Sequence, residues 1–149
     1  MNAARISILV LVAGGLLLLV TPALARVEGA TSIRQAHRTT RHAYKTYREA
    51  LRVEQGTRLY TGRYGANVGR WTRLARRVGW PWGCLPNLMY IIDRESGGSP
   101  TARNPSSASG LLQLMSIHWA GKFDPFNPRK NLAYGLKLYR SSGWQPWAL

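Results

Sequence analysis

A wide apolar face between Leu85 and Ile92 is the feature that most constrains the fold of this chain. Its members recur at the three- and four-residue spacing of an α-helix and are Leu85, Leu88, Met89, Ile91 and Ile92. Pro86 is tolerated in a first helical turn, and the glycines and proline at positions 97, 98 and 100 end the pattern. The spacing therefore predicts a buried helix that carries Glu95 at its C-terminal end.

The first 25 residues have the three-part pattern of an export signal. Arg5 precedes an apolar run from Ile6 to Val20, and a cleavage site of the Ala-x-Ala type ends at Ala25. The alternative is an uncleaved membrane anchor, which needs roughly 20 apolar residues to cross the hydrocarbon core, more than this run offers. We expect a cleaved signal peptide over residues 1–25 and a mature protein that works outside the cytoplasm.

The 149-residue chain carries 21 Lys and Arg against six Asp and Glu, a formal net charge of +15. Basic residues recur every three or four positions early in the chain, at Arg34, Arg38, Arg41, Lys45, Arg48 and Arg52. This spacing puts positive charge along one face of a helix, which we predict over residues 31–54. Four glycines between positions 56 and 69 then predict a loop or mobile linker over residues 57–69. Residues 26–69 are thus expected to form a basic helical and linker segment.

The remaining residues, 70–149, are expected to form one folded domain. A short amphipathic helix is predicted over residues 70–78, and a longer one over residues 129–140. Residues 101–109 are polar and rich in turn formers, and residues 110–115 are expected to form an extended segment or one strand of a short hairpin. The predicted class is predominantly α-helical α+β, with a basic helix before the domain.

Cysteine and histidine chemistry is poorly supported. Cys84 is the single cysteine, so it can form no intramolecular disulfide, and its apolar surroundings favour a small buried residue over a nucleophile. His37, His42 and His118 have no spacing that would build a metal site or a catalytic triad. We therefore expect no metal and no organic cofactor.

Glu95 is the best candidate for acid catalysis. An apolar setting and the negative end of a helix dipole both favour the protonated form of a carboxyl group, which general acid catalysis needs. Ile91 and Ile92 lie on nearby turns of the same predicted helix. The alternative is an exposed glutamate that forms an ion pair with Arg94 or Arg103.

Four ordered fragments decide between these interpretations. They are Ile92–Gly98 with the letters IDRESGG, Ser107–Met115 with SASGLLQLM, Phe123–Pro128 with FDPFNP, and Asn131–Gly135 with NLAYG. In this order they resemble the lytic transglycosylase SLT domain of the lysozyme-like superfamily, over roughly residues 71–147. The resemblance implies a lysozyme-like domain that acts on peptidoglycan glycan strands. The family's further Ala-Tyr-Asn-Ala-Gly motif does not occur in this sequence.

The resemblance also implies roles for particular residues. Carried over by position, it makes Glu95 the catalytic acid and base and places Ser96, Gln113 and Met115 next to the substrate sugars. Each of the last three has a plainer interpretation, since Ser96 could simply end the helix and Met115 could belong to the core. Gln113 is the hardest of them to explain by packing.

A glycosidase with two carboxylates needs a second acid across the scissile bond. Asp93 lies about 200° around the helix from Glu95, at roughly 3.6 residues per turn, and so points away from it. Asp124 precedes a proline, where an aspartate commonly caps its own turn. A single glutamate fits the transglycosylase mechanism, in which the muramic acid's own hydroxyl attacks and a 1,6-anhydro sugar forms. Hydrolysis by water stays open.

Two aromatic groups near the C-terminus have competing interpretations. Tyr139 shares helical spacing with Leu132 and Leu136, so core packing is favoured over contact with substrate. Trp144 and Trp147 could stack on sugar rings or close the core, and we expect at least one of them to be buried.

Three functions remain to be weighed. The first is an exported, cell-wall-associated enzyme that cleaves the β-1,4 bond between MurNAc and GlcNAc, and whose basic segment helps it reach anionic wall polymers. The second is a lysozyme-like module that binds glycan strands without cutting them. The third is nucleic-acid binding, suggested by tyrosines among the arginines, but the export signal argues against it. The expected partner is therefore peptidoglycan, with no nucleic acid and no membrane span after cleavage of the signal.

Overall fold

The structure is a computed structural model that describes residues 29–149. The predicted signal peptide, residues 1–25, lies outside the described residues. The chain divides into two compact units, residues 1–42 and residues 43–149, and each is described by itself. Residues 29–42 of the first unit are the opening turns of helix α1 (Gly29–Tyr64), and their side chains from residue 32 onward are exposed. No helix in the described part of the chain is both long and apolar enough to cross a bilayer.

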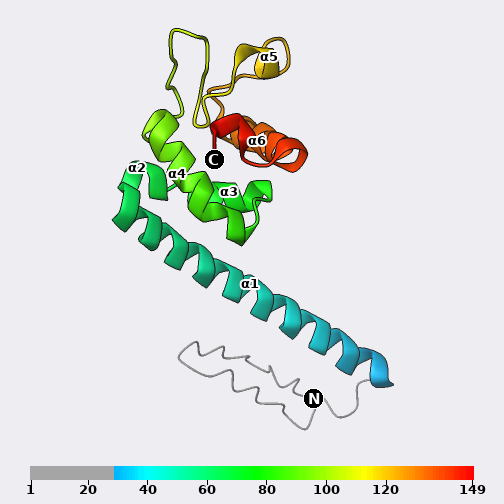
Figure 1. Ribbon diagram of the computed structural model, residues 1–149. Coiled ribbons are helices and arrows are strands. Elements are labelled where there is room, and N and C mark those ends of the chain that lie inside the picture. The colour runs from blue at the N-terminus through cyan, green and yellow to red at the C-terminus, as the bar shows by residue number, and fades with distance from the viewer. Residues whose placement is uncertain (1–28) are drawn as a thin grey trace, which may run out of the picture. The chain divides into compact units, whose positions relative to one another are not determined.

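The second unit is mostly helical (Figure 1). After α1 come three short helices, α2 (Ala66–Gly69), α3 (Thr72–Val78) and the 3-10 turn η2 (Trp82–Cys84). They are followed by α4 (Leu85–Ser96), α5 (Ser116–Trp119), α6 (Pro128–Ser142) and a second 3-10 turn, η3 (Gln145–Trp147). The positions of α3, α4 and α6 agree with the helices predicted from apolar spacing.

The loop predicted for residues 57–69 is wrong, because α1 continues to Tyr64 and α2 follows at once. Gly56 and Gly69 serve packing. A Cβ atom on Gly56 would lie 3.3 Å from the side chains of Thr72 and Trp82, and one on Gly69 would lie 2.1 Å from the Thr61 hydroxyl oxygen. Gly65, with φ of 86°, makes the break between the two helices. The domain boundary predicted at residue 70 stays a prediction.

The predicted hairpin or extended segment at residues 110–115 is replaced by a turn. Among the described residues the β pairing here consists of two isolated antiparallel bridges, Arg103 with Ser109 and Ser109 with Leu114. Gly110 and Gln113 both have positive φ, of 78° and 46°, which bends the backbone away from a strand. The segment is therefore a compact looped connection between α4 and α5.

The core lies between α3, α4 and α6. Trp80 is fully buried at its centre, where its indole N–H donates to the carbonyl oxygen of Leu132 at 3.0 Å. The side chains that are at most 1 % exposed and pack in the same cluster are Val68, Ala75, Trp80, Leu85, Leu88, Met89, Ile91, Ile92, Leu111, Leu112 and Leu132. Cys84 is also buried in this cluster, as its apolar neighbours predicted.

The C-terminal half of α1 is attached to α3 by an ion pair. Arg76 donates to Oε1 of Glu49 through two nitrogens, at 2.9 and 2.8 Å, and the indole N–H of Trp82 donates to Oε2 at 3.1 Å. Arg76 also donates to the carbonyl oxygen of Trp80. Burial alone would raise the pKa of the Glu49 carboxyl, but the hydrogen bonds from Arg76 and Trp82, with the charge of Arg76, outweigh it and lower that pKa.

Because the pKa of Glu49 is lowered in the folded state, the stability that its ionised carboxylate contributes depends on pH. This contribution is complete above the pKa of a glutamate in the unfolded chain, roughly 4.3, and is lost as the pH falls through the pKa of Glu49 in the folded protein. We therefore expect the difference in Tm between the wild type and Glu49→Gln to be constant from pH 5 to 7 and to shrink in stronger acid. Thermal unfolding followed by circular dichroism measures it.

The control is Glu54→Gln, because Glu54 pairs with Arg58 on the exposed side of α1, where ion pairs contribute little. Its Tm should stay close to that of the wild type throughout. A Glu49→Gln difference that is the same at pH 3 and pH 7 would contradict the account of this contact.

Candidate functional site

Glu95 lies in the last turn of α4, one residue before its end. Leu88, Met89, Ile91 and Ile92 on the same helix are 0 % exposed, so the backbone beneath Glu95 is held by the core. The Glu95 side chain is 26 % exposed. The carboxylate is therefore rigidly carried and still reachable from solvent, as a proton-transfer group must be.

Arg94 connects Glu95 to the C-terminal turn of the chain. Its guanidinium donates to Oε1 of Glu95 at 3.0 Å and to the carbonyl oxygen of Trp147 at 2.6 Å. The hydrogen bond to Glu95 raises the pKa of Arg94 above its ordinary value. The ion pair that the sequence offered as the alternative to catalysis is thus present with Arg94, and it holds one carboxylate oxygen in a defined place.

Ser96 joins the end of α4 to the turn at residues 110–113. Its hydroxyl lies 3.0 Å from the carbonyl oxygen of Ile92 and 2.9 Å from that of Leu111, and it accepts from the amide of Gly98 at 3.2 Å. One hydroxyl proton serves the two carbonyls in turn. Every one of these contacts is to the protein backbone, so Ser96 positions the residues around Glu95.

Gln113 closes the same turn. Its side-chain amide donates to the carbonyl oxygens of Ala102 at 3.1 Å and Gly110 at 2.9 Å. Its φ of 46° is uncommon for a residue other than glycine, and such backbone strain gathers at functional sites. Met115, two residues on, is 46 % exposed, so it does not belong to the core. The structure brings Ser96 and Gln113 to one turn and leaves Met115 on its surface.

Sequence reasoning placed Asn131 in a family fragment but missed its structural role. Asn131 lies on α6, is 0 % exposed, and makes three hydrogen bonds to backbone groups. It accepts from the amide of Leu112 at 3.0 Å and donates to the carbonyl oxygens of Ser109 at 3.1 Å and Pro125 at 3.0 Å. The turn that carries Gln113 is therefore held on α6 by one buried side chain.

Two glycines allow this close approach. A Cβ atom on Gly110 would lie 2.3 Å from both Nδ2 of Asn131 and the carbonyl oxygen of Pro125. A Cβ atom on Gly135 would lie 2.2 Å from Cδ1 of Leu112. The glycines of the second and fourth sequence fragments are thus packing requirements of one contact between the turn and α6.

The other two acids of this region do not partner Glu95. Asp93 is exposed on α4. Oδ1 of Asp124 accepts from the amide of Phe126 at 2.9 Å, which confirms the predicted turn-capping role.

The aromatic residues near the C-terminus mainly serve packing. Tyr139 lies 5.5 Å from Trp80 and 4.4 Å from Trp144 between ring centroids, which confirms the core role predicted for it. Trp147 is buried, and its indole N–H donates to the carbonyl oxygen of Leu112 at 3.0 Å, so the expected burial of one tryptophan is confirmed. Tyr134 is half-buried against Phe123 and His118.

Comparison with known families agrees with this arrangement. The model of the transglycosylase SLT domain matches residues 80–142, the segment that contains α4, the turn and α6. Residues 80–142 are therefore similar to the transglycosylase SLT domain family. Within this matched segment Glu95 lies in the last turn of α4, and Asn131 and Gly135 lie on α6.

Curated relatives carry related names. The chain is 34% identical over 77 residues to the endo-type membrane-bound lytic murein transglycosylase A of Enterobacter sp., which covers 51% of this chain and 30% of the relative. It is 33% identical over 109 residues to the "Probable transglycosylase IsaA" of Staphylococcus epidermidis, which covers 72% of this chain and 41% of the relative. The chain thus spans less than half the length of these relatives. No solved structure matches it significantly.

Asn131→Ala tests whether this side chain supports the site. The change leaves the buried amide of Leu112 and the carbonyl oxygen of Pro125 without a partner, and removes one of the two donors to the carbonyl oxygen of Ser109. It should cost about 3 kcal/mol of unfolding free energy and lower the Tm by roughly 10 °C. Urea and thermal unfolding measure both quantities. Asn87→Ala, at an exposed position on α4, is the matched control and should change stability by less than about 0.5 kcal/mol. Equal effects of the two substitutions would contradict the role given to Asn131.

Proposed function

We propose that the protein is an exported peptidoglycan lytic transglycosylase that cleaves the β-1,4 bond between MurNAc and GlcNAc with Glu95 as its single catalytic carboxylate. The observation that carries the proposal is the place of Glu95. It lies in the last turn of α4 inside the matched SLT segment, 26 % exposed, beside the strained turn that holds Gln113. The names of the relatives, lytic murein transglycosylases among them, support the substrate class.

The proposed reaction uses Glu95 twice. Its carboxyl group first gives a proton to the leaving oxygen of GlcNAc as the bond from that oxygen to C1 of MurNAc breaks. The carboxylate then takes the proton of the MurNAc C6 hydroxyl, whose oxygen bonds to C1 and forms the 1,6-anhydro ring. No water is consumed. The guanidinium of Arg94, 3.0 Å from Oε1, stabilises the negative charge present between the two steps.

A tethered hydroxyl makes a second carboxylate unnecessary. An inverting hydrolase positions a water with a second acid, roughly 6.5–9.5 Å from the first. In the substrate proposed here the nucleophile is already part of the sugar, so its effective concentration is high. The exposure of Asp93 and the turn-capping bond of Asp124 favour the mechanism with one glutamate.

Ser96, Gln113 and Met115 are assigned to the substrate side of this site. Met115 offers exposed apolar surface on which the face of a sugar ring can pack. Ser96 and Gln113 act by shaping the turn beside Glu95, because their described hydrogen bonds go to backbone carbonyl and amide groups. The basic segment on α1 is assigned to the attraction of anionic wall polymers.

Product analysis tests the proposal directly. Purified peptidoglycan is digested with wild type, Glu95→Gln and the exposed control Asp93→Asn, and the released fragments are identified by mass spectrometry. Wild type and Asp93→Asn should release 1,6-anhydro muropeptides at similar rates. Glu95→Gln should lower the rate by at least about 10²-fold, because it can neither give nor take the proton.

The other outcomes separate the competing functions. Fragments with free reducing ends from the wild type would make the protein a muramidase-type hydrolase that still uses Glu95. Sedimentation of wild type and variant with peptidoglycan without any release would indicate a binding module. An active Glu95→Gln enzyme would overturn the assignment of Glu95.

A further inference from the structure

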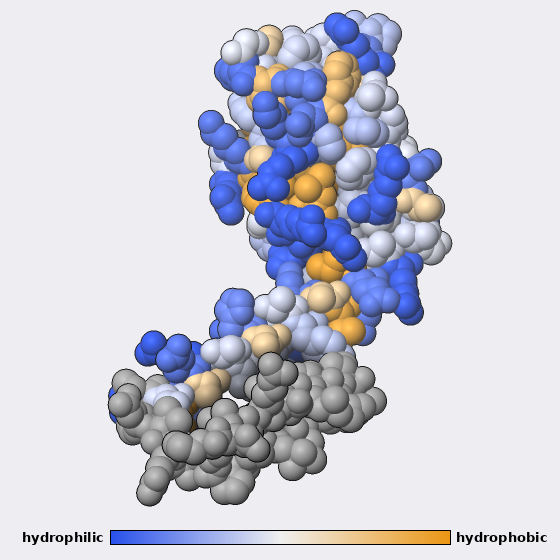
Figure 2. Space-filling view, turned by 180° about the vertical axis from the view of Figure 1, so that it is seen from behind, coloured by the Kyte–Doolittle hydropathy of each residue, from blue (hydrophilic) through white to orange (hydrophobic). Residues whose placement is uncertain are grey.

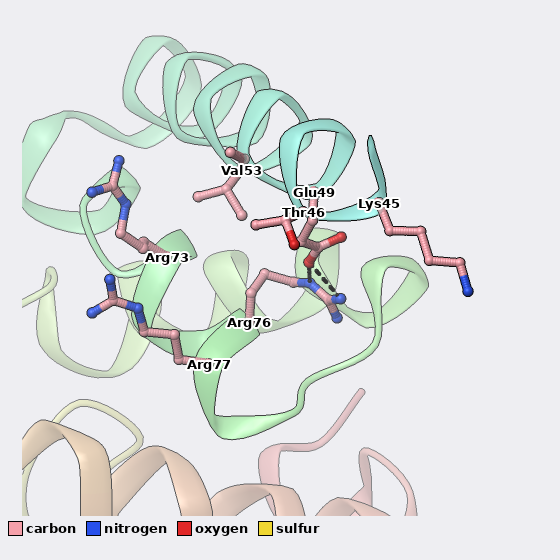
Figure 3. Close-up of a pocket in the computed structure, with 8 residues that line it drawn as sticks. Lys45, Thr46, Glu49, Val53, Arg73, Arg76 and Arg77 are labelled. Atoms are coloured by element: carbon pink, nitrogen blue, oxygen red, sulfur yellow. Dashed lines mark hydrogen bonds and ion pairs between the residues drawn. The ribbon is translucent and has the colours of Figure 1, made fainter. Parts of the chain in front are cut away.

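A hollow between α1 and α3 lies apart from the four predicted site residues. We call it the α1–α3 hollow. Lys45, Glu49 and Val53 line it from α1, and Arg73, Arg76 and Arg77 line it from α3 (Figure 3). It is open to solvent on one side, and all its residues belong to the unit at residues 43–149. Four cations and one acid therefore share one concave surface.

The one acid that lines the hollow, Glu49, already has partners within the protein. Oε1 of Glu49 accepts two hydrogen bonds from Arg76, and Oε2 accepts one from Trp82, so both oxygens have partners within the protein. Figure 3 shows the Glu49–Arg76 pair between Lys45 on one side and Arg73 and Arg77 on the other. Lys45, Arg73 and Arg77 form no ion pair with any residue that the structure describes. Their charge is available to a ligand.

Arg73 and Arg77 repel each other on α3. They are four residues apart on α3, so their side chains are neighbours on one helix face, and like charges at this spacing destabilise a helix. Both side chains are exposed. A bound anion would remove this repulsion and would receive two planar guanidinium groups, which form paired hydrogen bonds with oxyanions.

The shape of the hollow favours a polymer with repeated anionic groups. Two guanidinium groups on neighbouring turns, whose Cβ atoms are about 5–6 Å apart, suit successive phosphodiesters along a flexible chain. Val53 and Ala50 give the hollow apolar surface, against which the carbon linkers between successive phosphodiesters can pack. The open side lets a chain enter and leave, and the net charge of +15 draws polyanions to the protein. On the face drawn in Figure 2, strongly hydrophilic side chains lie among pale and hydrophobic ones.

We infer that the α1–α3 hollow binds the phosphodiester groups of an anionic polymer through Arg73 and Arg77, with Lys45 as a further contact. This binding is independent of Glu95 and of bond cleavage. It would hold the protein on a polyanionic surface by a defined site in the folded unit, in addition to the diffuse attraction of the basic residues on α1.

The test compares two double variants that lose the same charge. Arg73→Gln/Arg77→Gln removes the pair in the hollow, and Arg129→Gln/Arg140→Gln removes two exposed arginines of α6. Binding of fluorescent poly(glycerol phosphate) to the full chain is measured by anisotropy at several salt concentrations. The hollow variant should bind at least about tenfold more weakly. For the hollow variant, the slope of log K against log salt concentration should be smaller in magnitude by roughly one to two. The α6 variant should change the affinity by less than about threefold.

Each other outcome overturns the inference. Equal weakening by the two double variants would mean that only overall charge matters. Equally tight, Arg73-dependent binding of poly-glutamate would make the site one for carboxylates, and tighter binding of single-stranded DNA would make it a nucleic-acid site. Circular dichroism must show wild-type folding for both variants. Glu95→Gln should bind the polymer as wild type does, so a failure of the proposed catalysis would leave this result unaffected.

Discussion

Three buried hydrogen bonds from Asn131 hold the parts of the site together. The side chain stands on α6 and binds the backbone of Ser109, Leu112 and Pro125, so it joins the helix to the turn and to the segment before α6. A buried polar group that lost these partners would carry an unfavourable free energy, so the arrangement is specific. The remaining contacts of the site attach to this turn.

From the turn, the support extends to Glu95, the proposed catalytic carboxylate. The hydroxyl of Ser96 reaches the carbonyl oxygen of Leu111 from α4, and the indole of Trp147 reaches that of Leu112 from the C-terminal turn. Arg94 completes this set of contacts, because its guanidinium donates both to Glu95 and to the carbonyl oxygen of Trp147. Glu95 is thus positioned by α4, whose apolar face is buried, and by the hydrogen bonds that join α4 to the turn and to the C-terminal residues. The inferred binding of an anionic polymer involves other helices, α1 and α3.

The helices of the core were predictable because their apolar residues recur at helical spacing, as on α4 and α6. The length of α1 was not, because Gly56 looks like a helix breaker when its tightly packed neighbours, Thr72 and Trp82, are unknown. The sequence predicts an extended segment at residues 110–115 where the structure has a turn, since the positive φ of Gln113 has no sequence signature. The place of Glu95 near the end of α4 was predictable from the same apolar spacing, and its catalytic role stays a prediction. Asn131 contacts the backbone of residues 109 and 112, and Arg94 contacts the C-terminal turn. Both contacts connect residues far apart in sequence, and no spacing rule reveals them.

The most direct test of the account is a crystal structure of Glu95→Gln with a bound MurNAc–GlcNAc oligosaccharide. The account predicts that the scissile oxygen lies within hydrogen-bond distance of the Gln side chain at position 95 and that a sugar ring contacts Met115. It also predicts that Asn131 keeps its three hydrogen bonds, to the backbone of Ser109, Leu112 and Pro125. An oligosaccharide bound away from residue 95, with that side chain turned from the glycan, would contradict the central claim.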